Sequence, residues 1–425
     1  MDFEIEKVLP NGLGRAGTIR TPHGEIKTPA FIAVGTHGYV RFILSEELHT
    51  LGAQAMLSNG YHLRHQASEI AEAGGLAAVK PSLWEDTSES TAHKVSEAGL
   101  LPSSQPWQGP TLTDSGGFQV MSLGSGLGKV VSMEKERGVM NTAHKERLAH
   151  VAEKGVSFID PFNGQPDFIG PEESMRIQCQ IGADIHMAFD ELTSLADTYE
   201  YNIEAMKRTE RWAERSLREH LKHRDDLGYR QSLYGVLQGG RWEDLRRQTA
   251  KTLANMRVGG VGFDGFGLGG AFLKEDLGEI LRWCNEELPP EKSRHLLGLS
   301  HPDDIFIGTE MGADTFDCVA PMREARHGKI YTRQGNINLR KYTNAGELLD
   351  RDCDCATCRA GWTRGSLRAL WRSGDVEKKA KYYNLASIHN LRFIVRLTEE
   401  IRAAILGDYF AEYKRDFLQK YYTEA

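Results

Sequence analysis

The residues of this sequence with the most recognisable chemistry are three closely spaced cysteines, Cys353, Cys355 and Cys358. Three thiolates and one imidazole close a tetrahedral site of the kind that holds structural zinc, whereas a catalytic zinc keeps one position open for water. His389, in a stretch of helical composition, can supply the imidazole. The four residues are therefore predicted to bind one structural Zn²⁺. The alternative for the cysteines, chance proximity, is poor because only three others occur in the chain; for His389 alone, an ordinary helix residue is a fair alternative.

Three aspartates, Asp114, Asp190 and Asp317, stand at or just after the ends of short apolar runs. Gln238 and the pair 269–270 (Gly-Gly) occupy equivalent places. In a (β/α)8 barrel the active site lies at the C-terminal ends of the strands, and two carboxylates beside a glycosidic carbon can act as nucleophile and acid/base. A single such aspartate is more often a helix N-cap. Three in register with Gln238 favour an active site.

A local excess of basic residues follows Asp317 in this otherwise acidic chain. Such an excess can contact nucleic-acid phosphates. The alternative is a solvated loop of mixed charge, since Glu324 interrupts the run, and the segment alone does not decide between them. The basic residues are Arg323, Arg326, His327, Lys329, Arg333, Arg340 and Lys341.

Eight apolar runs that end in Gly, Asn or Asp alternate with helix-like stretches such as 202–223 and 242–256. Near-continuous apolar runs are typical of strands buried on both faces, and alternation with helices predicts a parallel sheet. Eight units predict a closed α/β (β/α)8 TIM barrel. An open doubly wound sheet is the alternative, but no Gly-x-Gly-x-x-Gly turn follows the first strand. The runs are 29–36, 53–60, 110–117, 185–190, 232–239, 262–270, 295–299 and 315–320.

Two segments do not follow the repeat. Residues 122–157 are predicted to form an insertion on the barrel rim, with a glycine-rich start and a charged, helical stretch up to Lys154. Residues 341–425 hold the cysteine cluster and further helical patterns, among them 382–397. The predicted organisation is a catalytic barrel over 1–340 and a zinc-binding subdomain with C-terminal helices over 341–425.

The composition is that of a globular protein, with 425 residues, 40% hydrophobic and 26% charged. A formal net charge of −7 argues weakly against a protein that coats nucleic acid non-specifically, but allows a local basic patch. Neither a signal peptide nor a run of ~18 apolar residues is recognisable. We therefore expect no membrane association and a cytoplasmic location.

Together the motifs resemble the tRNA-guanine transglycosylase family in its bacterial form. They keep the family's order and spacing over nearly the whole chain, and the family fold is a (β/α)8 barrel with an inserted zinc subdomain near its C-terminal end. The matching segments are TDSGGFQVMSL (113–123), MAFDE (187–191), LQGG (237–240), GLGG (267–270), HPDDI (301–305), FDCVAP (316–321), CDCATC (353–358) and IHN (388–390).

The resemblance implies exchange of guanine at the wobble position (nucleotide 34) of tRNAs with a GUN anticodon for a 7-deazaguanine, in queuosine biosynthesis. Asp317 matches the nucleophile that forms a covalent ribosyl-enzyme, and Asp114 matches the general acid/base. A homodimer is implied as well. From the basic segment after Asp317, Arg323 and Arg326 are the predicted RNA contacts. The remaining matched positions are Asp190 and Gln238 at the base edge, Gly270 and Ala271 at the base through their backbone, Ser115, Phe118 and Asn59 as further active-site residues, and Cys353, Cys355, Cys358 and His389 as zinc ligands.

The chain departs from the family pattern near the expected base pocket. Queuine-using members carry a small residue at the position of Leu273, and Leu192 stands where bacterial members usually have cysteine. Phe272 is also large. Added volume in a packed pocket costs ~1–3 kcal/mol, enough to exclude the cyclopentenediol of queuine but not an aminomethyl group. The predicted incoming base is therefore preQ1, although the small Ala271 leaves room for a reshaped pocket.

The alternatives to this function are a queuine-using tRNA enzyme, a deazaguanine transglycosylase acting on DNA, a non-catalytic tRNA-binding subunit and a metal-dependent hydrolase. The DNA enzyme would share the barrel, but the segment after Asp317 and the zinc cluster favour tRNA. A non-catalytic subunit should lack Asp114 or Asp317, and both are present. A metallohydrolase needs histidine and carboxylate ligands at strand ends, where no histidine cluster is apparent.

Overall fold

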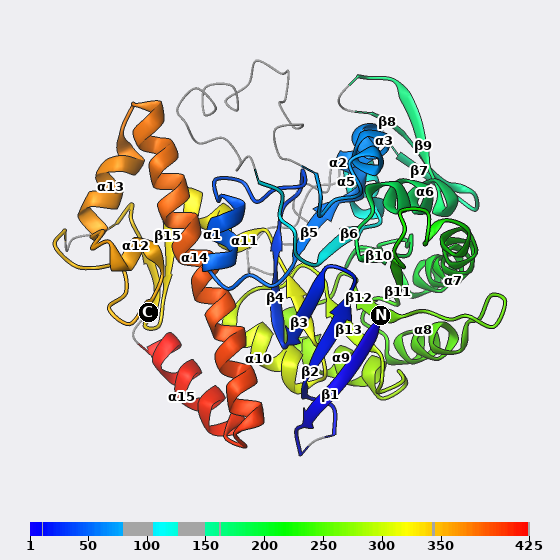
Figure 1. The fold of residues 1–425 in the computed structure, drawn as a ribbon. Coiled ribbons are helices and arrows are strands. Elements are labelled where there is room, and N and C mark those ends of the chain that lie inside the picture. The colour runs from blue at the N-terminus through cyan, green and yellow to red at the C-terminus, as the bar shows by residue number, and fades with distance from the viewer. Residues whose placement is uncertain (11, 80–104, 126–148, 161–162, 342–344, 424–425) are drawn as a thin grey trace.

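The computed structural model describes residues 1–10, 12–79, 105–125, 149–160, 163–341 and 345–423. Eight parallel strands close into a barrel in the order β10-β11-β12-β13-β14-β4-β5-β6 (Figure 1). Seven of the eight predicted runs contain one of these strands, and the run 295–299 overlaps the strand that begins at Ser293, so the predicted (β/α)8 barrel is confirmed. The strands are β4 (Ala30–Val34), β5 (Met56–Asn59), β6 (Thr111–Asp114), β10 (Ile185–Met187), β11 (Ser232–Leu237), β12 (Gly265–Leu268), β13 (Ser293–Leu296) and β14 (Thr315–Asp317).

Helices surround the barrel, and the predicted stretches 202–223 and 242–256 fall in two of them, α7 (Tyr199–His223) and α8 (Glu243–Asn255). Helix α6 (Pro171–Ile181) begins with a proline, which presets the backbone, and ends at Gly182 in the left-handed conformation, a common helix stop. The other elements of this part are α1 (Ser45–Thr50), α2 (Gly60–Leu63), η1 (Arg64–Gln66), α3 (Ala67–Glu72), α5 (Gly117–Ser125), η3 (Lys274–Asp276), α9 (Leu277–Asn285), α10 (Pro302–Glu310) and α11 (Ala320–Arg326).

Side chains alternate between the barrel interior and the helical layer. Leu57 and Leu112 belong to the apolar cluster that fills the barrel, whereas their neighbour Met56 packs in the larger core outside it. Two residues beyond Leu57 and Leu112, Asn59 and Asp114 therefore also face inward, and they are paired across β5 and β6. The inward rows thus change from apolar to polar at the C-terminal ends of the strands.

An antiparallel sheet of β1 (Asp2–Val8), β2 (Arg15–Thr21) and β3 (Gly24–Thr28) covers the opposite end of the barrel. Ile19 and Ile26 from this sheet belong to the same buried cluster as the interior strand residues. Arg15 joins the sheet to the barrel, because its Nε and Nη2 donate to the two carboxylate oxygens of Asp314 at 2.8 and 2.7 Å. Both side chains are almost completely buried.

The rim insertion differs in part from its prediction. Residues 149–159 form a β-hairpin, β7 (Ala149–Ala152) and β8 (Gly155–Ile159), which β9 (Pro166–Ile169) extends to three antiparallel strands. The expectation of helix up to Lys154 is therefore wrong for this stretch. Gly155, with a φ of 154°, allows the turn, and Val156 and Phe158 bury one face of the hairpin. The part of the prediction that falls on 126–148 lies outside the described residues.

The C-terminal part contains the predicted helical stretch 382–397 within the long helix α14 (Val376–Leu406). This helix packs against α11 and against the barrel strand β4, and in Figure 1 it runs along one side of the barrel. None of the helices in the described ranges has the length and apolar character needed to cross a membrane. The other elements are β15 (Lys329–Thr332), β16 (Gly335–Asn338), α12 (Ala356–Arg359), α13 (Arg364–Arg372) and α15 (Phe410–Thr423).

The buried Arg15–Asp314 pair predicts a large stability effect. Arg15→Met leaves the Asp314 carboxylate buried without its cation, and loss of one partner of a buried pair typically costs about 3–5 kcal/mol. The free energy of unfolding, measured by urea titration, should fall by that amount. Arg20→Met on the same strand removes an exposed pair with Glu4 and Glu25 and should have little effect. Equal stabilities of the two variants would contradict the role given to Arg15.

Candidate active site and metal centre

Asp114 is the last residue of β6 and is held from two sides. Its Oδ2 accepts hydrogen bonds from Asn59 Nδ2 at 2.6 Å and Gln119 Nε2 at 3.3 Å. Its Oδ1 accepts from the backbone N–H groups of Gly60 at 3.0 Å and Gly116 at 3.2 Å. Burial nevertheless raises the pKa of Asp114 to about 7, and the charge of Asp317 adds to this effect. A carboxyl group with such a pKa can both donate and accept a proton near neutrality.

Asp317 ends β14 and has different surroundings. Its Oδ1 contacts His295 Nε2 at 3.2 Å and accepts from the backbone N–H of Gly298 at 3.0 Å. Its Oδ2 accepts no hydrogen bond from the described residues, and 13% of the side chain is exposed. One carboxylate oxygen is therefore fixed, while the other is open to the barrel mouth.

His295 holds Asp317 and was not among the predicted site residues. It is completely buried on β13, and its Nδ1 contacts Thr315 Oγ1 at 2.8 Å. His295 lay inside a predicted strand, but nothing in the sequence showed that it would face the same interior layer as Asp317. The pairing of β13 with β14 brings the two residues together.

Asp190, Ser115 and Gln238 come from three neighbouring strand ends and contact one another. Asp190 Oδ2 accepts from Gln238 Nε2 at 2.6 Å, and its Oδ1 accepts from Ser115 Oγ at 3.3 Å. Burial raises the pKa of Asp190 to about 6. Gln238 Oε1 is buried and has no hydrogen-bond partner among the described residues. The group thus presents acceptor oxygens suited to the N–H donors of a flat heterocycle.

The turn after β12 is shaped by a buried arginine. Arg246 is completely buried on α8, and its Nη1 donates to Gly269 O at 2.7 Å and its Nε to Gly240 O at 2.7 Å. Gly270 has a φ of 118°, and a Cβ there would lie 2.3 Å from Arg246 Nη2. The chain thus requires glycine at 270 and exposes its backbone at the site. Arg246 was not predicted, because sequence alone does not distinguish it from a surface arginine.

Four further residues that were predicted at or near the bound base differ in exposure. Ala271 is half-buried. Phe272 is only 8% exposed and its ring lies beneath Arg246, with 5.6 Å between the guanidinium carbon and the ring centroid. Leu273 is 45% exposed, and Phe118 on α5 is 38% exposed. Phe272 therefore packs into the core, which leaves Leu273 and Leu192 as the side chains on which the steric argument about the incoming base rests.

The basic segment after Asp317 divides into two groups. Lys329 pairs with Glu324 at 2.9 Å, Arg333 pairs with Glu400, and Arg340 lies over the ring of Trp371. These side chains therefore serve the packing of the C-terminal part.

Arg323 and Arg326, by contrast, lie on α11 near a third arginine, Arg41. Burial lowers the pKa of Arg326, and the positive charges of Arg41 and Arg323 lower it further. Arg41, Val319 and Arg326 line one pocket beside the end of β14. Because like charges are brought together here without a described acidic partner for Arg326, the three form an anion-attracting group.

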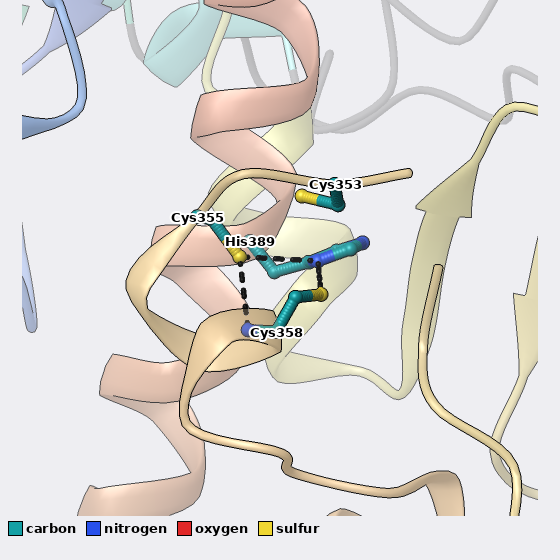
Figure 2. A group of neighbouring side chains, drawn as sticks. All are labelled: Cys353, Cys355, Cys358 and His389. Atoms are coloured by element: carbon teal, nitrogen blue, oxygen red, sulfur yellow. Dashed lines mark hydrogen bonds between the residues drawn. The ribbon is translucent and has the colours of Figure 1, made fainter. Parts of the chain in front are cut away.

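The predicted metal ligands converge (Figure 2). Cys355 Sγ and Cys358 Sγ lie 3.5 and 3.2 Å from Nδ1 of His389, and with Cys353 all ligand atoms fall within 4.8 Å of one another. His389 comes from α14, and its Nε2 contacts the backbone oxygen of Tyr331 at 2.7 Å. A carbonyl in that place orients a metal-bound imidazole. The cluster can therefore hold a metal ion.

Comparison with known proteins agrees with this geometry. The sequence pattern of the family described as queuine tRNA-ribosyltransferase matches residues 11–423. This chain belongs to that family. The queuine tRNA-ribosyltransferase of Halothermothrix orenii is 36% identical over 98% of this chain and 96% of its own. The enzyme of the same name from Desulforamulus reducens is 37% identical over 98% of both chains, and that from Lactococcus lactis subsp. lactis is 36% identical over 96% and 92%.

The convergence of the four ligands predicts that Cys355→Ser removes one metal ion per chain. A hydroxyl is a poorer ligand than a thiolate for the ions that cysteine sites select, so bound metal, counted by elemental analysis after gel filtration, should fall by about one equivalent from the wild-type value. Cys284→Ser, at a buried cysteine outside the cluster, should leave the metal content unchanged. An unaltered metal content in Cys355→Ser would contradict the assignment.

Proposed function

We propose that the protein is a tRNA-guanine transglycosylase that replaces the wobble guanine of tRNAs with a GUN anticodon by preQ1, in queuosine biosynthesis. The proposal rests on two features that lie together at one barrel mouth. One is a pair of carboxyl groups in unlike surroundings, and the other is a separate set of buried acceptor oxygens. The first suits cleavage of a bond between ribose and base, and the second suits recognition of the base.

Asp317 is the proposed nucleophile. Its open Oδ2 attacks C1′ of the ribose while the C1′–N9 bond breaks and its electron pair leaves with guanine, which gives a covalent ribosyl-enzyme. His295 and Gly298 hold the other oxygen and keep the carboxylate oriented. Asp114, with its pKa near 7, donates a proton to the departing guanine. It then accepts a proton from the incoming base, whose N9 displaces Asp317 from C1′.

Asp190 and Gln238 are proposed to accept hydrogen bonds from the edge of the base, and Ser115 keeps Asp190 in place. The backbone at Gly270 and Ala271 would contact the same base. Two neighbours complete the pocket. Phe118 offers an exposed ring against which the base can stack, and Asn59 orients Asp114 by donating to it.

The polynucleotide is proposed to be RNA in a loop, because a base must leave its stack to reach the barrel interior. Arg323 and Arg326, with Arg41, would bind phosphates beside the target nucleotide. A DNA substrate is the alternative, and labelled guanine exchange on tRNA and on duplex DNA distinguishes the two.

The metal in the Cys353, Cys355, Cys358 and His389 cluster is proposed to be zinc. Four protein ligands close its coordination, so the ion would stabilise the chain rather than bind substrate. Residues 341–425 would then act as a zinc-binding subdomain.

We further propose a cytoplasmic homodimer with this region at its contact, since Leu406, Tyr409 and Tyr422 of the C-terminal helices are 41%, 45% and 52% exposed.

The proposed nucleophile is tested with Asp317→Ala. Loss of the attacking oxygen should reduce guanine exchange on tRNA by at least about 10³-fold, with binding of tRNA retained because the arginine group is unchanged. Denaturing gels should show a covalent tRNA–protein band with wild type that is missing with the variant. Asp225→Ala, at an exposed aspartate after α7, should behave as wild type. Substantial activity of Asp317→Ala would refute the mechanism.

The proposed base is tested by competition. Wild type should incorporate preQ1 into guanine-containing tRNA at least about tenfold more efficiently than queuine, since rejection of a bulky ring by a packed pocket amounts to ~1–3 kcal/mol. Leu273→Ala should narrow that ratio by improving the use of queuine. Equal kcat/KM for the two bases with wild type would show that the steric argument is wrong.

A further inference from the structure

A second group of metal-ligating side chains lies between the barrel and its helices, away from the Cys353 cluster. It consists of Cys179 on α6, His186 on β10 and His220 on α7. His186 points outward from the barrel, because its neighbours Ile185 and Met187 fill the interior. The three side chains are 3%, 0% and 1% exposed, so water does not satisfy their polar atoms.

The ligand atoms are arranged as around an ion. Cys179 Sγ lies 3.9 Å from His186 Nδ1 and 3.8 Å from His220 Nδ1. All three ligand atoms lie within 4.8 Å of one another. Metal–sulfur and metal–nitrogen bonds of about 2.3 and 2.0–2.1 Å place sulfur and nitrogen about 3.6 Å apart in tetrahedral and about 3.8 Å apart in trigonal coordination. The distances found here thus match a three-coordinate ion without rearrangement of the sulfur–nitrogen pairs.

Hydrogen bonding alone explains this arrangement poorly. A thiol can donate its one hydrogen to one ring and can accept only weakly from the other, because sulfur is a weak acceptor. The Nδ1 atoms of both rings are directed at the one sulfur, and two nitrogens directed at one sulfur are what coordination of a shared ion requires.

We propose that Cys179, His186 and His220 form a second metal site, for a thiophilic d¹⁰ ion such as Zn²⁺ or Cu⁺. Thiolate with imidazole selects such ions over Mg²⁺ or Ca²⁺. Binding displaces the thiol proton to solvent and joins Sγ to the metal. The ion would connect α6, α7 and β10, four residues before Asp190.

The test counts ions on the full-length chain. Because the cluster is buried, the ion is best supplied while the chain folds, so the protein is refolded under reducing, oxygen-free conditions with Zn²⁺ or with Cu⁺ and then gel-filtered. Wild type should retain two ions per chain after refolding with at least one of the two metals. The metal that gives two ions per chain is the one that the second site binds. Cys179→Ala and His186→Leu should each retain one, whereas Cys284→Ala should retain two.

The absorbance of bound Co²⁺ gives a second readout of the site that does not depend on counting ions. With Co²⁺, wild type should show more thiolate-to-metal charge-transfer absorbance than His220→Leu, while the absorbance from the Cys353 cluster remains in both. One ion per chain in wild type with both Zn²⁺ and Cu⁺ would overturn the proposal, and so would equal counts in wild type and folded Cys179→Ala.

Discussion

The strict alternation of side chains along eight closed strands is the constraint on which the rest of the structure depends. Once Leu57 and Leu112 occupy the barrel interior, Asn59 and Asp114 must face the same way two residues later. The same geometry places Asp317 in the interior beside Ile32, its partner on β4. Polar groups that would be costly in the middle of the barrel are tolerated at its end, where the strands stop and a substrate can enter.

Desolvation at this end has unequal effects on the carboxyl groups. Asp114 accepts four hydrogen bonds, yet burial and the neighbouring charge of Asp317 still raise its pKa to about 7. Asp190 is also shifted upward, to about 6, while Asp317 retains partial exposure. One barrel mouth thereby holds two carboxyl groups whose pKa values are raised by burial beside a third that is partly exposed.

The sequence predicted those parts of the structure that depend on local patterns. Apolar runs ending in polar residues located all eight strands, and cysteine spacing located three metal ligands. Contacts that depend on pairing between distant strands were not predictable in this way. His295 contacts Asp317 only because β13 lies beside β14. Arg246 donates to the backbone oxygen of Gly269 only because the fold brings α8 against the barrel. The hairpin at 149–159 was missed because its charged composition resembles a helix, while Gly155 and the burial of Val156 and Phe158 decide otherwise.

Helix α14 has a consequence for how the chain acquires its structure. The same helix carries His389 of the metal cluster and covers the barrel at β4. Asn390 donates to the backbone oxygens of Pro321 and Lys329 and accepts from the N–H of Tyr331, which ties it to the segment after Asp317. The cover of the barrel at β4 is therefore supplied by a segment that lies almost at the end of the chain. Because synthesis starts at the N-terminus, this face of the barrel stays uncovered until a helix made almost at the end is available, and a metal ion bound at the cluster would hold that same helix.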